Sequence, residues 1–274
     1  MILVDGAERA VISALDRGLA YGDGVFRTLA IREGAPRQWR RQYAKLAADC
    51  EAIGITPPAE LLLRGEVRQI AQAEQRCALK IIVTRGPSER GYRYDTKTPA
   101  VRIVLSSPYP QYPPSYYDCG VRVRRCRVRL AGQPALAGIK HLNRLENVLA
   151  RAEWTDSDIA EGLLLDNGDC VIGGTMSNLF LGRSGTLVTP DLDRCGVAGV
   201  TRDRVIHAAT ARGIAITIGN IGWRDVLSAD EAFLVNSLAG VWPICELEGT
   251  KLSTGPLVRS VQCWLDQDDD ADLA

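Results

Sequence analysis

The sequence predicts an α+β protein with two domains, in which mixed sheets are flanked by helices. Short segments of alternating apolar and polar residues, typical of strands, recur along the chain. Segments with apolar residues at three- and four-residue steps lie between them and end at glycine, which predicts helices. A proline-rich stretch at 108–118 predicts an extended linker between an N-terminal domain, 1–107, and a C-terminal domain, 119–265. The acidic end, 266–274, is predicted to be a frayed tail.

The elements of the N-terminal domain follow from local signals. The helix predicted at 37–53 has apolar residues at helical spacing and ends at Gly54, a favourable C-terminal residue. A second helix follows the two prolines at 57–58 and runs to about Gln75. Strands are predicted at 2–4, 25–31, 79–84 and 101–105.

The C-terminal domain is predicted to hold more strands than helices. A hairpin turn at 166–169 joins two of its strands, because Asp, Asn and Gly favour such turns. Helices are predicted after residue 140 to about 155, at 199–212 and from 255 onward. Strands are predicted at 121–128, 161–165, 171 onward, 186–189, 214–218, 232–236 and 241–245.

Composition excludes several classes of function. Lys+Arg and Asp+Glu both number 33, so the formal net charge is zero, and neither a nucleic-acid partner nor an anionic membrane partner is expected. The eight cysteines include no CxxC pair and there are only two histidines, so we expect reduced thiols and no metal site. The sequence shows no signal peptide and no apolar run of membrane-spanning length, which predicts a cytoplasmic protein.

One lysine is a candidate for covalent chemistry. Lys140 is one of only five lysines, and it follows a short apolar segment broken by glycine and precedes a segment with helical spacing. Burial beside a packed helix would lower the pKa of Lys140, as an amine that attacks carbonyl carbon requires. Most lysines are solvated surface groups, so position alone does not decide the role. The side chains expected on the packed helix face are Leu142, Leu145, Val148 and Leu149.

The segment around this lysine, 138–147, resembles the cofactor-binding lysine segment of the fold-type IV pyridoxal-phosphate family. That family includes branched-chain and D-amino-acid aminotransferases and aminodeoxychorismate lyases, and the Lys-His-Leu-Asn-Arg form is most similar to the lyases. The resemblance runs from about Asp5 to Cys263. Its other motifs lie at 16–28, 84–86, 90–92, 177–180 and 199–202.

The resemblance implies pyridoxal 5′-phosphate as the cofactor, held as a Schiff base by Lys140. It also implies a phosphate site at a helix N-terminus with Val200 and Thr201, although Thr201 could instead be an ordinary helix cap. Ser237 matches a second phosphate-contacting hydroxyl. Lys45 matches a phosphate-binding arginine of relatives, although it could instead be a surface lysine. Asn143 matches an asparagine near the cofactor, or it caps the helix that follows.

The same resemblance implies which groups bind the substrate. Arg90 and Tyr92 match the loop in which relatives hold a substrate carboxylate, a role that suits the charge-assisted hydrogen bonds of arginine. Thr28 faces the same site by resemblance, although strand pairing alone would explain it. Gly173 is a departure, because relatives usually have a glutamate there that keeps the pyridine nitrogen of the cofactor protonated. We therefore expect water or another side chain to face that nitrogen.

The implied activity is a lyase reaction that converts 4-amino-4-deoxychorismate to 4-aminobenzoate and pyruvate, a step of folate synthesis, in a homodimer. Lys140 would remove a ring proton, and Lys140 or Thr28 would deliver one to the pyruvate carbon. Two alternatives stay open: an aminotransferase of the same fold acting on D-amino or branched-chain acids, and an impaired cofactor-binding homologue, suggested by Gly173 and Lys45. The missing glutamate favours the lyase, because formation of an aromatic ring supplies driving force that transamination lacks.

Overall fold

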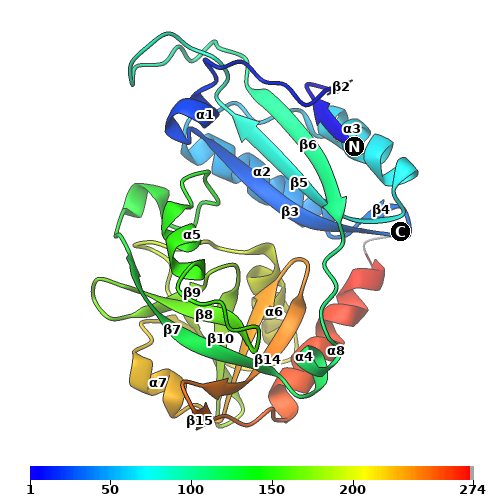
Figure 1. The fold of residues 1–274 in the computed structure, drawn as a ribbon. Coiled ribbons are helices and arrows are strands. Elements are labelled where there is room, and N and C mark those ends of the chain that lie inside the picture. The colour runs from blue at the N-terminus through cyan, green and yellow to red at the C-terminus, as the bar shows by residue number, and fades with distance from the viewer. Residues whose placement is uncertain (272–274) are drawn as a thin grey trace. The chain divides into compact units, whose positions relative to one another are not determined.

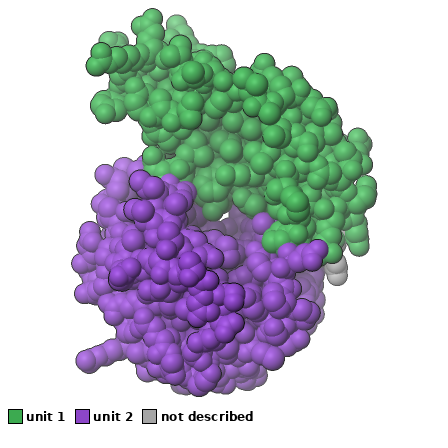
Figure 2. All heavy atoms as spheres, viewed as in Figure 1, with its two compact units in different colours: residues 1–110, 139–143, 272–274 green, residues 111–138, 144–271 purple. Residues whose placement is uncertain are grey.

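The computed structural model describes residues 1–271 and groups them into two compact units (Figures 1 and 2). Among the described residues, unit 1 contains 1–110 and Ile139–Asn143, and unit 2 contains 111–138 and 144–271. Each unit is built from a sheet and helices, which confirms the predicted α+β class. The short lysine segment therefore groups with the N-terminal part of the chain.

The six-stranded sheet of unit 1 has the order β2-β1-β6-β5-β3-β4, and its pairings are all antiparallel. Two helices, α2 (Trp39–Ala52) and α3 (Glu60–Ala73), cover one face of this sheet, and α1 (Arg17–Tyr21) precedes β3 (Figure 1). Mixed pairing is therefore confined to unit 2. The strands are β1 (Ile2–Val4), β2 (Ala7–Glu8), β3 (Gly24–Arg32), β4 (Ala35–Pro36), β5 (Arg76–Thr84) and β6 (Val101–Pro108).

Alternation along β3 and β5 gives this sheet two different faces, because successive side chains of a strand point in opposite directions. Phe26 and Thr28 of β3 and Lys80 of β5 lie on the face away from the two helices and are half-buried. That face carries the polar and aromatic groups of the candidate site. The residues buried on the helix side are Val25, Leu29, Ile31, Leu79 and Ile81.

The lysine segment runs along β3 as a short additional strand. The N–H of Phe26 donates to the carbonyl of Lys140 (2.9 Å), and the N–H of Leu142 donates to the carbonyl of Gly24 (2.9 Å). His141 forms an antiparallel bridge with Val25 between these two bonds. Main-chain hydrogen bonds therefore set the position of Lys140 relative to the strand that carries Phe26 and Thr28.

Unit 2 is built on a nine-stranded mixed sheet of order β12-β11-β10-β13-β14-β7-β8-β9, with β15 paired to β14. Strand β7 is parallel to both β8 and β14, and β11 is parallel to β12. Helices α6 (Val200–Ala211) and α8 (Pro256–Ala271) share a core with β13 and β14. The strands are β7 (Val121–Leu130), β8 (Ile159–Asp166), β9 (Val171–Gly174), β10 (Asn178–Arg183), β11 (Thr186–Pro190), β12 (Ile216–Gly219), β13 (Glu231–Asn236), β14 (Gly240–Leu247) and β15 (Thr250–Lys251).

Two segments at the predicted domain edges are more regular than expected. The predicted linker contains a short helix, α4 (Ser115–Asp118). Helix α8 continues to Ala271, so most of the predicted acidic tail is helical, and Arg204 pairs with Asp268 there (2.7 Å). The last part of that predicted tail, 272–274, lies outside the described residues. Within the described residues, no helix is both long enough and apolar enough to span a membrane.

The helix after Lys140 is shorter than predicted and packs differently. Helix α5 covers only Leu145–Arg151, and its buried residue is Ala150. Leu145, Val148 and Leu149 are 67%, 61% and 53% exposed, so the prediction that they form a packed face is wrong for the described chain. The periodicity identified the helix but not the side that faces the core.

Candidate active site

Lys140 lies in unit 1 with its amine beside the ring of Phe26. The distance from Nζ to the ring centroid is 4.6 Å, and Nζ of Lys80 on β5 lies 4.7 Å from the same centroid. The electron-rich face of an aromatic ring attracts such cations. Thr28 pairs directly with Lys80 in the sheet, so their side chains share one face. The structure thus places the amines of Lys140 and Lys80 at one ring, and Thr28 is paired with Lys80.

The backbone of Lys140 is held by a buried carboxylate as well as by β3. Its N–H donates to Oδ2 of Asp49 (3.2 Å). Asp49 lies on α2, is 1% exposed, and also forms ion pairs with Arg27 of β3 and Lys45 of α2. One carboxylate therefore connects α2, β3 and the lysine segment.

Lys45, the predicted phosphate ligand, lies in this same cluster. It is one helical turn before Asp49 and is half-buried, so it is more than a solvated surface lysine. Burial lowers the pKa of the neighbouring Arg27, and the charge of Asp49 opposes that shift. Because two cations share one carboxylate, the cluster carries excess positive charge, which suits an anionic ligand.

Asn143 does not cap the helix that follows it. Its Nδ2 donates to the carbonyl of Gly22 at the end of α1 (3.3 Å). The N-cap residue of α5 is Arg144, and no side chain caps that helix. The structure thus gives Asn143 a different contact, at the turn that leads into β3.

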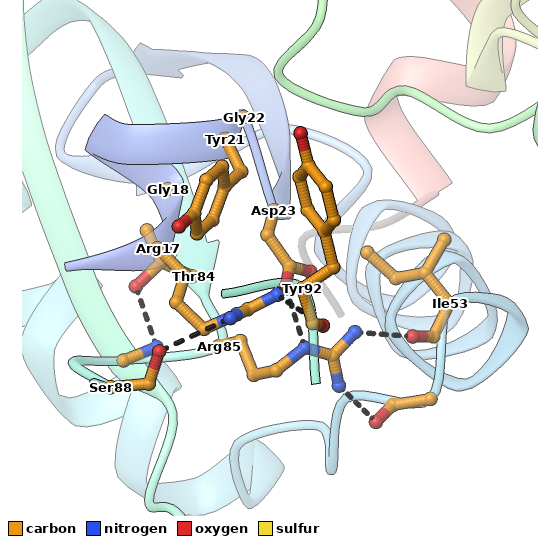
Figure 3. A network of polar contacts seen from close by, with 12 residues as sticks. Arg17, Gly18, Tyr21, Gly22, Asp23, Ile53, Thr84, Arg85, Ser88 and Tyr92 are labelled. Atoms are coloured by element: carbon orange, nitrogen blue, oxygen red, sulfur yellow. Dashed lines mark hydrogen bonds and ion pairs between the residues drawn. The ribbon is translucent and has the colours of Figure 1, made fainter. Parts of the chain in front are cut away.

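The loop that contains Arg90 and Tyr92 is anchored by a buried arginine (Figure 3). Arg17 donates to the carbonyls of Gly91 (2.9 Å) and Tyr92 (3.1 Å), and to the hydroxyl of Ser88 (3.1 Å). The ring of Tyr92 lies against that of Tyr21, with centroids 5.5 Å apart. The backbone of this loop is therefore held by side chains from α1.

The two predicted substrate residues of this loop are on its outside. Tyr92 is 85% exposed. Arg90 is also exposed and makes no hydrogen bond or ion pair with any described residue. An arginine with its donors available on an anchored loop suits the capture of a carboxylate.

Asp23 connects this anchor to a second buried arginine. Its Oδ2 accepts from Nε of Arg17 and from Nε of Arg85, both at 2.8 Å, as Figure 3 shows. Arg85 also donates to the carbonyls of Ile53 (2.6 Å) and Gly54 (2.7 Å). Burial by itself raises the pKa of Asp23, but the hydrogen bonds from Arg85 and Arg17 outweigh it and lower the pKa below its ordinary value.

In unit 2, the start of α6 has the properties of an anion site. Its N-cap residue is Gly199, and no side chain caps the first N–H groups of the helix. Thr201, in the first turn, is 3% exposed, and its hydroxyl has no hydrogen-bond partner among the described residues. A Cβ at position 199 would lie 2.3 Å from Oδ1 of Asn178, so a larger residue there would displace the Asn178 side chain. Ser237 is half-buried in the turn between β13 and β14.

Glu161 of β8 organises the loop before β10. Its carboxylate is 1% exposed and is reached only by neutral donors among the described residues. Those donors are the N–H groups of Gly162, Thr175 and Met176 and the hydroxyls of Thr175 and Ser177. A carboxylate has about four lone-pair positions, so these five donors saturate it. Glu161 therefore cannot accept a further hydrogen bond, and it cannot replace the glutamate that relatives usually have at the position of Gly173.

Position 173 itself excludes a side chain in this backbone conformation. A Cβ there would lie 2.8 Å from the carbonyl oxygen of Ser177. A glutamate at this position would therefore need the 174–177 loop to move. The expectation that water or another side chain faces the ring nitrogen stays a prediction.

The comparisons with known proteins identify the family. The class IV aminotransferase model matches residues 24–247. The chain belongs to the class IV aminotransferase family. Similar proteins include the aminodeoxychorismate lyase of Vibrio harveyi, 30% identical over 266 residues, which are 96% of this chain and 98% of that protein. A putative branched-chain aminotransferase of Methanocaldococcus jannaschii is 28% identical over 247 residues, which are 88% and 84% of the two chains.

A solved structure is more similar still. The crystal structure of 4-amino-4-deoxychorismate lyase from Pseudomonas aeruginosa is 46% identical, with a TM-score of 0.94, and the match covers 98% of this chain and all of that one. The predicted family and two-domain fold class are therefore confirmed. Membership of this family implies pyridoxal phosphate as the cofactor.

The residues of the class IV chain fit such a cofactor. Each unit by itself offers groups of the kind that such a cofactor needs: unit 1 has the amine of Lys140, and unit 2 has the uncapped start of α6 with the Thr201 hydroxyl.

The sequence did not predict the roles of Asp49, Lys80 and Glu161. The pairing of Lys80 with Thr28 could have been found, because both lie at the same register of adjacent predicted strands. The roles of Asp49 and Glu161 depend on contacts between distant segments, which no local pattern shows.

Proposed function

We propose that this class IV enzyme is a pyridoxal-phosphate-dependent lyase that converts 4-amino-4-deoxychorismate to 4-aminobenzoate and pyruvate. The similarity to two proteins named as this lyase, over nearly their whole length, supports the proposal. The site observation that carries it is the amine of Lys140 beside Phe26, with the Lys80 ammonium at the same ring. A substrate with carboxylate groups needs such a second cation near the reacting amine.

Lys140 would serve first as the anchor of the cofactor and then as the base. When bound, pyridoxal phosphate supplies an electron sink for negative charge at the carbon next to the substrate nitrogen. The Nζ of Lys140, when not bonded to the cofactor, would take the proton from that carbon of the substrate ring. Thr28, which pairs with Lys80 in the sheet, would hold or return a proton on the enolpyruvate side.

The other groups would bind and orient. We propose that the α6 N-terminus, with Val200 and Thr201, and the hydroxyl of Ser237 bind the cofactor phosphate. Lys45 would add positive charge for the same anion, and Asn143 would fix the turn beside the lysine segment. Arg90 and Tyr92 would bind a substrate carboxylate from the loop that Arg17 anchors.

Two further proposals concern the context of the enzyme. The exposed apolar side chains of α5 support a homodimer, because a contiguous apolar surface is typical of an interface. The eight cysteines are free, which supports a cytoplasmic location in which 4-aminobenzoate serves folate synthesis. Sedimentation velocity would test the dimer directly.

An aminotransferase of the same fold is the second candidate, supported by the Methanocaldococcus jannaschii relative. An impaired homologue is the third. The deciding experiment incubates the protein with 4-amino-4-deoxychorismate and pyridoxal phosphate and follows 4-aminobenzoate by fluorescence, beside Lys140→Ala. We expect product from the wild type and none from the variant. Amine exchange between amino and keto acids without 4-aminobenzoate would identify the aminotransferase, and a yellow protein with neither activity the impaired homologue.

A further inference from the structure

The peptide groups around Lys140 are held from two sides by different parts of unit 1. The carbonyl of Lys140 accepts from the N–H of Phe26 at 2.9 Å, which fixes it to β3. Its N–H donates to Oδ2 of Asp49 at 3.2 Å, which fixes it to α2. Asp49 thus reaches this N–H from a position 91 residues earlier in the chain.

The Asp49 carboxylate is itself firmly placed. It is 1% exposed, with Arg27 on one oxygen and Lys45 on the other. Arg27 is 3% exposed, and its ion pair with Asp49 is its one polar contact among the described residues. Its Nε is buried without a partner. The buried charge of Arg27 therefore depends on Asp49 for its counter-charge. A buried ion pair is costly to desolvate, so core packing alone does not explain why these two residues are charged.

The geometry points to Asp49 as a positioning residue for Lys140, an inference that rests on the proposed function of that lysine. By accepting from the Lys140 N–H, Asp49 limits movement of the peptide that carries the reactive side chain. The amine then stays at the Phe26 ring, on the face that Thr28 and Lys80 share. Small displacements of a reacting group are costly in rate, so a freed peptide is expected to slow the chemical step.

The test separates this role from the stability of the buried ion pair. Asp49→Asn and Asp49→Ala are each made together with Arg27→Met, so that neither protein contains a buried arginine without its carboxylate. Arg27→Met/Asp49→Asn keeps an oxygen that accepts from Lys140, and Arg27→Met/Asp49→Ala does not. The two double variants therefore differ in the acceptor.

Three quantities are compared between the two double variants. The first is hydrogen exchange of the peptide that contains residues 139–142, measured without cofactor. The second is the pH midpoint of the absorbance change of bound pyridoxal phosphate. The third is kcat against KM. For the alanine form we expect faster exchange, a midpoint displaced by about half a pH unit or more, and kcat lower by about tenfold with KM little changed.

Equal values of all three in the two double variants would overturn the proposal. Faster exchange with an unchanged midpoint and unchanged kcat would also overturn it, because Asp49 would then have only a structural role. The exchange and absorbance measurements do not need turnover. If the wild type makes no 4-aminobenzoate, the proposed function fails while the inference about Asp49 is still decided.

Discussion

Asp49 in unit 1 and Glu161 in unit 2 are equally buried carboxylates that the protein stabilises in different ways. Both are 1% exposed. Asp49 is paired with two cations, Arg27 and Lys45, and with one N–H. Glu161 is surrounded by five neutral donors from its own strand and the nearby loop. The charge of Asp49 is therefore needed by its partners, whereas Glu161 is needed for the number and direction of its hydrogen bonds.

The largest effect is expected for Asp49→Leu. This change leaves Arg27 buried without a counter-charge, which we expect to lower the free energy of unfolding by about 3–5 kcal/mol. Urea unfolding followed by circular dichroism measures it. Arg27→Met/Asp49→Leu should recover most of the loss, because both buried charges are gone. A double variant as unstable as Asp49→Leu alone would contradict the ion-pair explanation.

Glu161→Gln should have a smaller effect. The amide keeps one acceptor oxygen but turns an NH2 group toward donors of the 175–177 loop, which we expect to cost about 2 kcal/mol. The thermal unfolding midpoint and proteolysis within the loop are the measurements. Glu33→Gln is the control, because Glu33 is 83% exposed in its ion pair and should leave both unchanged. Equal results for the two variants would show that the hydrogen bonds of Glu161 do not stabilise the loop.

How much of this could be predicted depended on the range of the contacts. The segment around Lys140 and the glycine before α6 are local patterns, so sequence alone indicated both. Lys45 and Asp49 are four residues apart on one helix, and from sequence alone this spacing predicts an exposed ion pair. Only the structure shows that Arg27 of β3 is a second partner of Asp49. The partners of Glu161 lie up to 16 residues further along the chain. The exposed face of α5 was mispredicted because periodicity gives a stripe but not what covers it.

Arg17→Lys sharpens the comparison with a third carboxylate, Asp23, which is shared by two arginines. Lysine cannot reproduce the fork that holds the carbonyls of Gly91 and Tyr92, so the 88–94 loop should loosen. We expect KM for 4-amino-4-deoxychorismate to rise by about five- to tenfold with kcat within about twofold. Arg93→Lys, an exposed change in the same loop, is the matched variant. A kcat effect without a KM effect would argue against loop anchoring.

The smallest expected effect is the pH dependence that Asp23 contributes. Because the pKa of Asp23 is lowered in the folded protein, the unfolded chain takes up its proton first as the pH falls. The stabilisation is therefore complete above the ordinary value of about 4 and is lost as the pH falls through the folded pKa. Thermal unfolding between pH 3 and 6 should show a shallower slope for Asp23→Asn than for the wild type. Parallel slopes would assign the acid sensitivity elsewhere.

The most direct test of the account is to find which lysine holds the cofactor. Borohydride reduction of the yellow protein fixes pyridoxal phosphate to its lysine, and peptide mass spectrometry then locates it. We predict modification of Lys140, with Lys80 and Lys45 unmodified although both lie in the same unit. Modification of Lys80 or Lys45 in place of Lys140 would contradict the account, and so would the absence of any modified lysine.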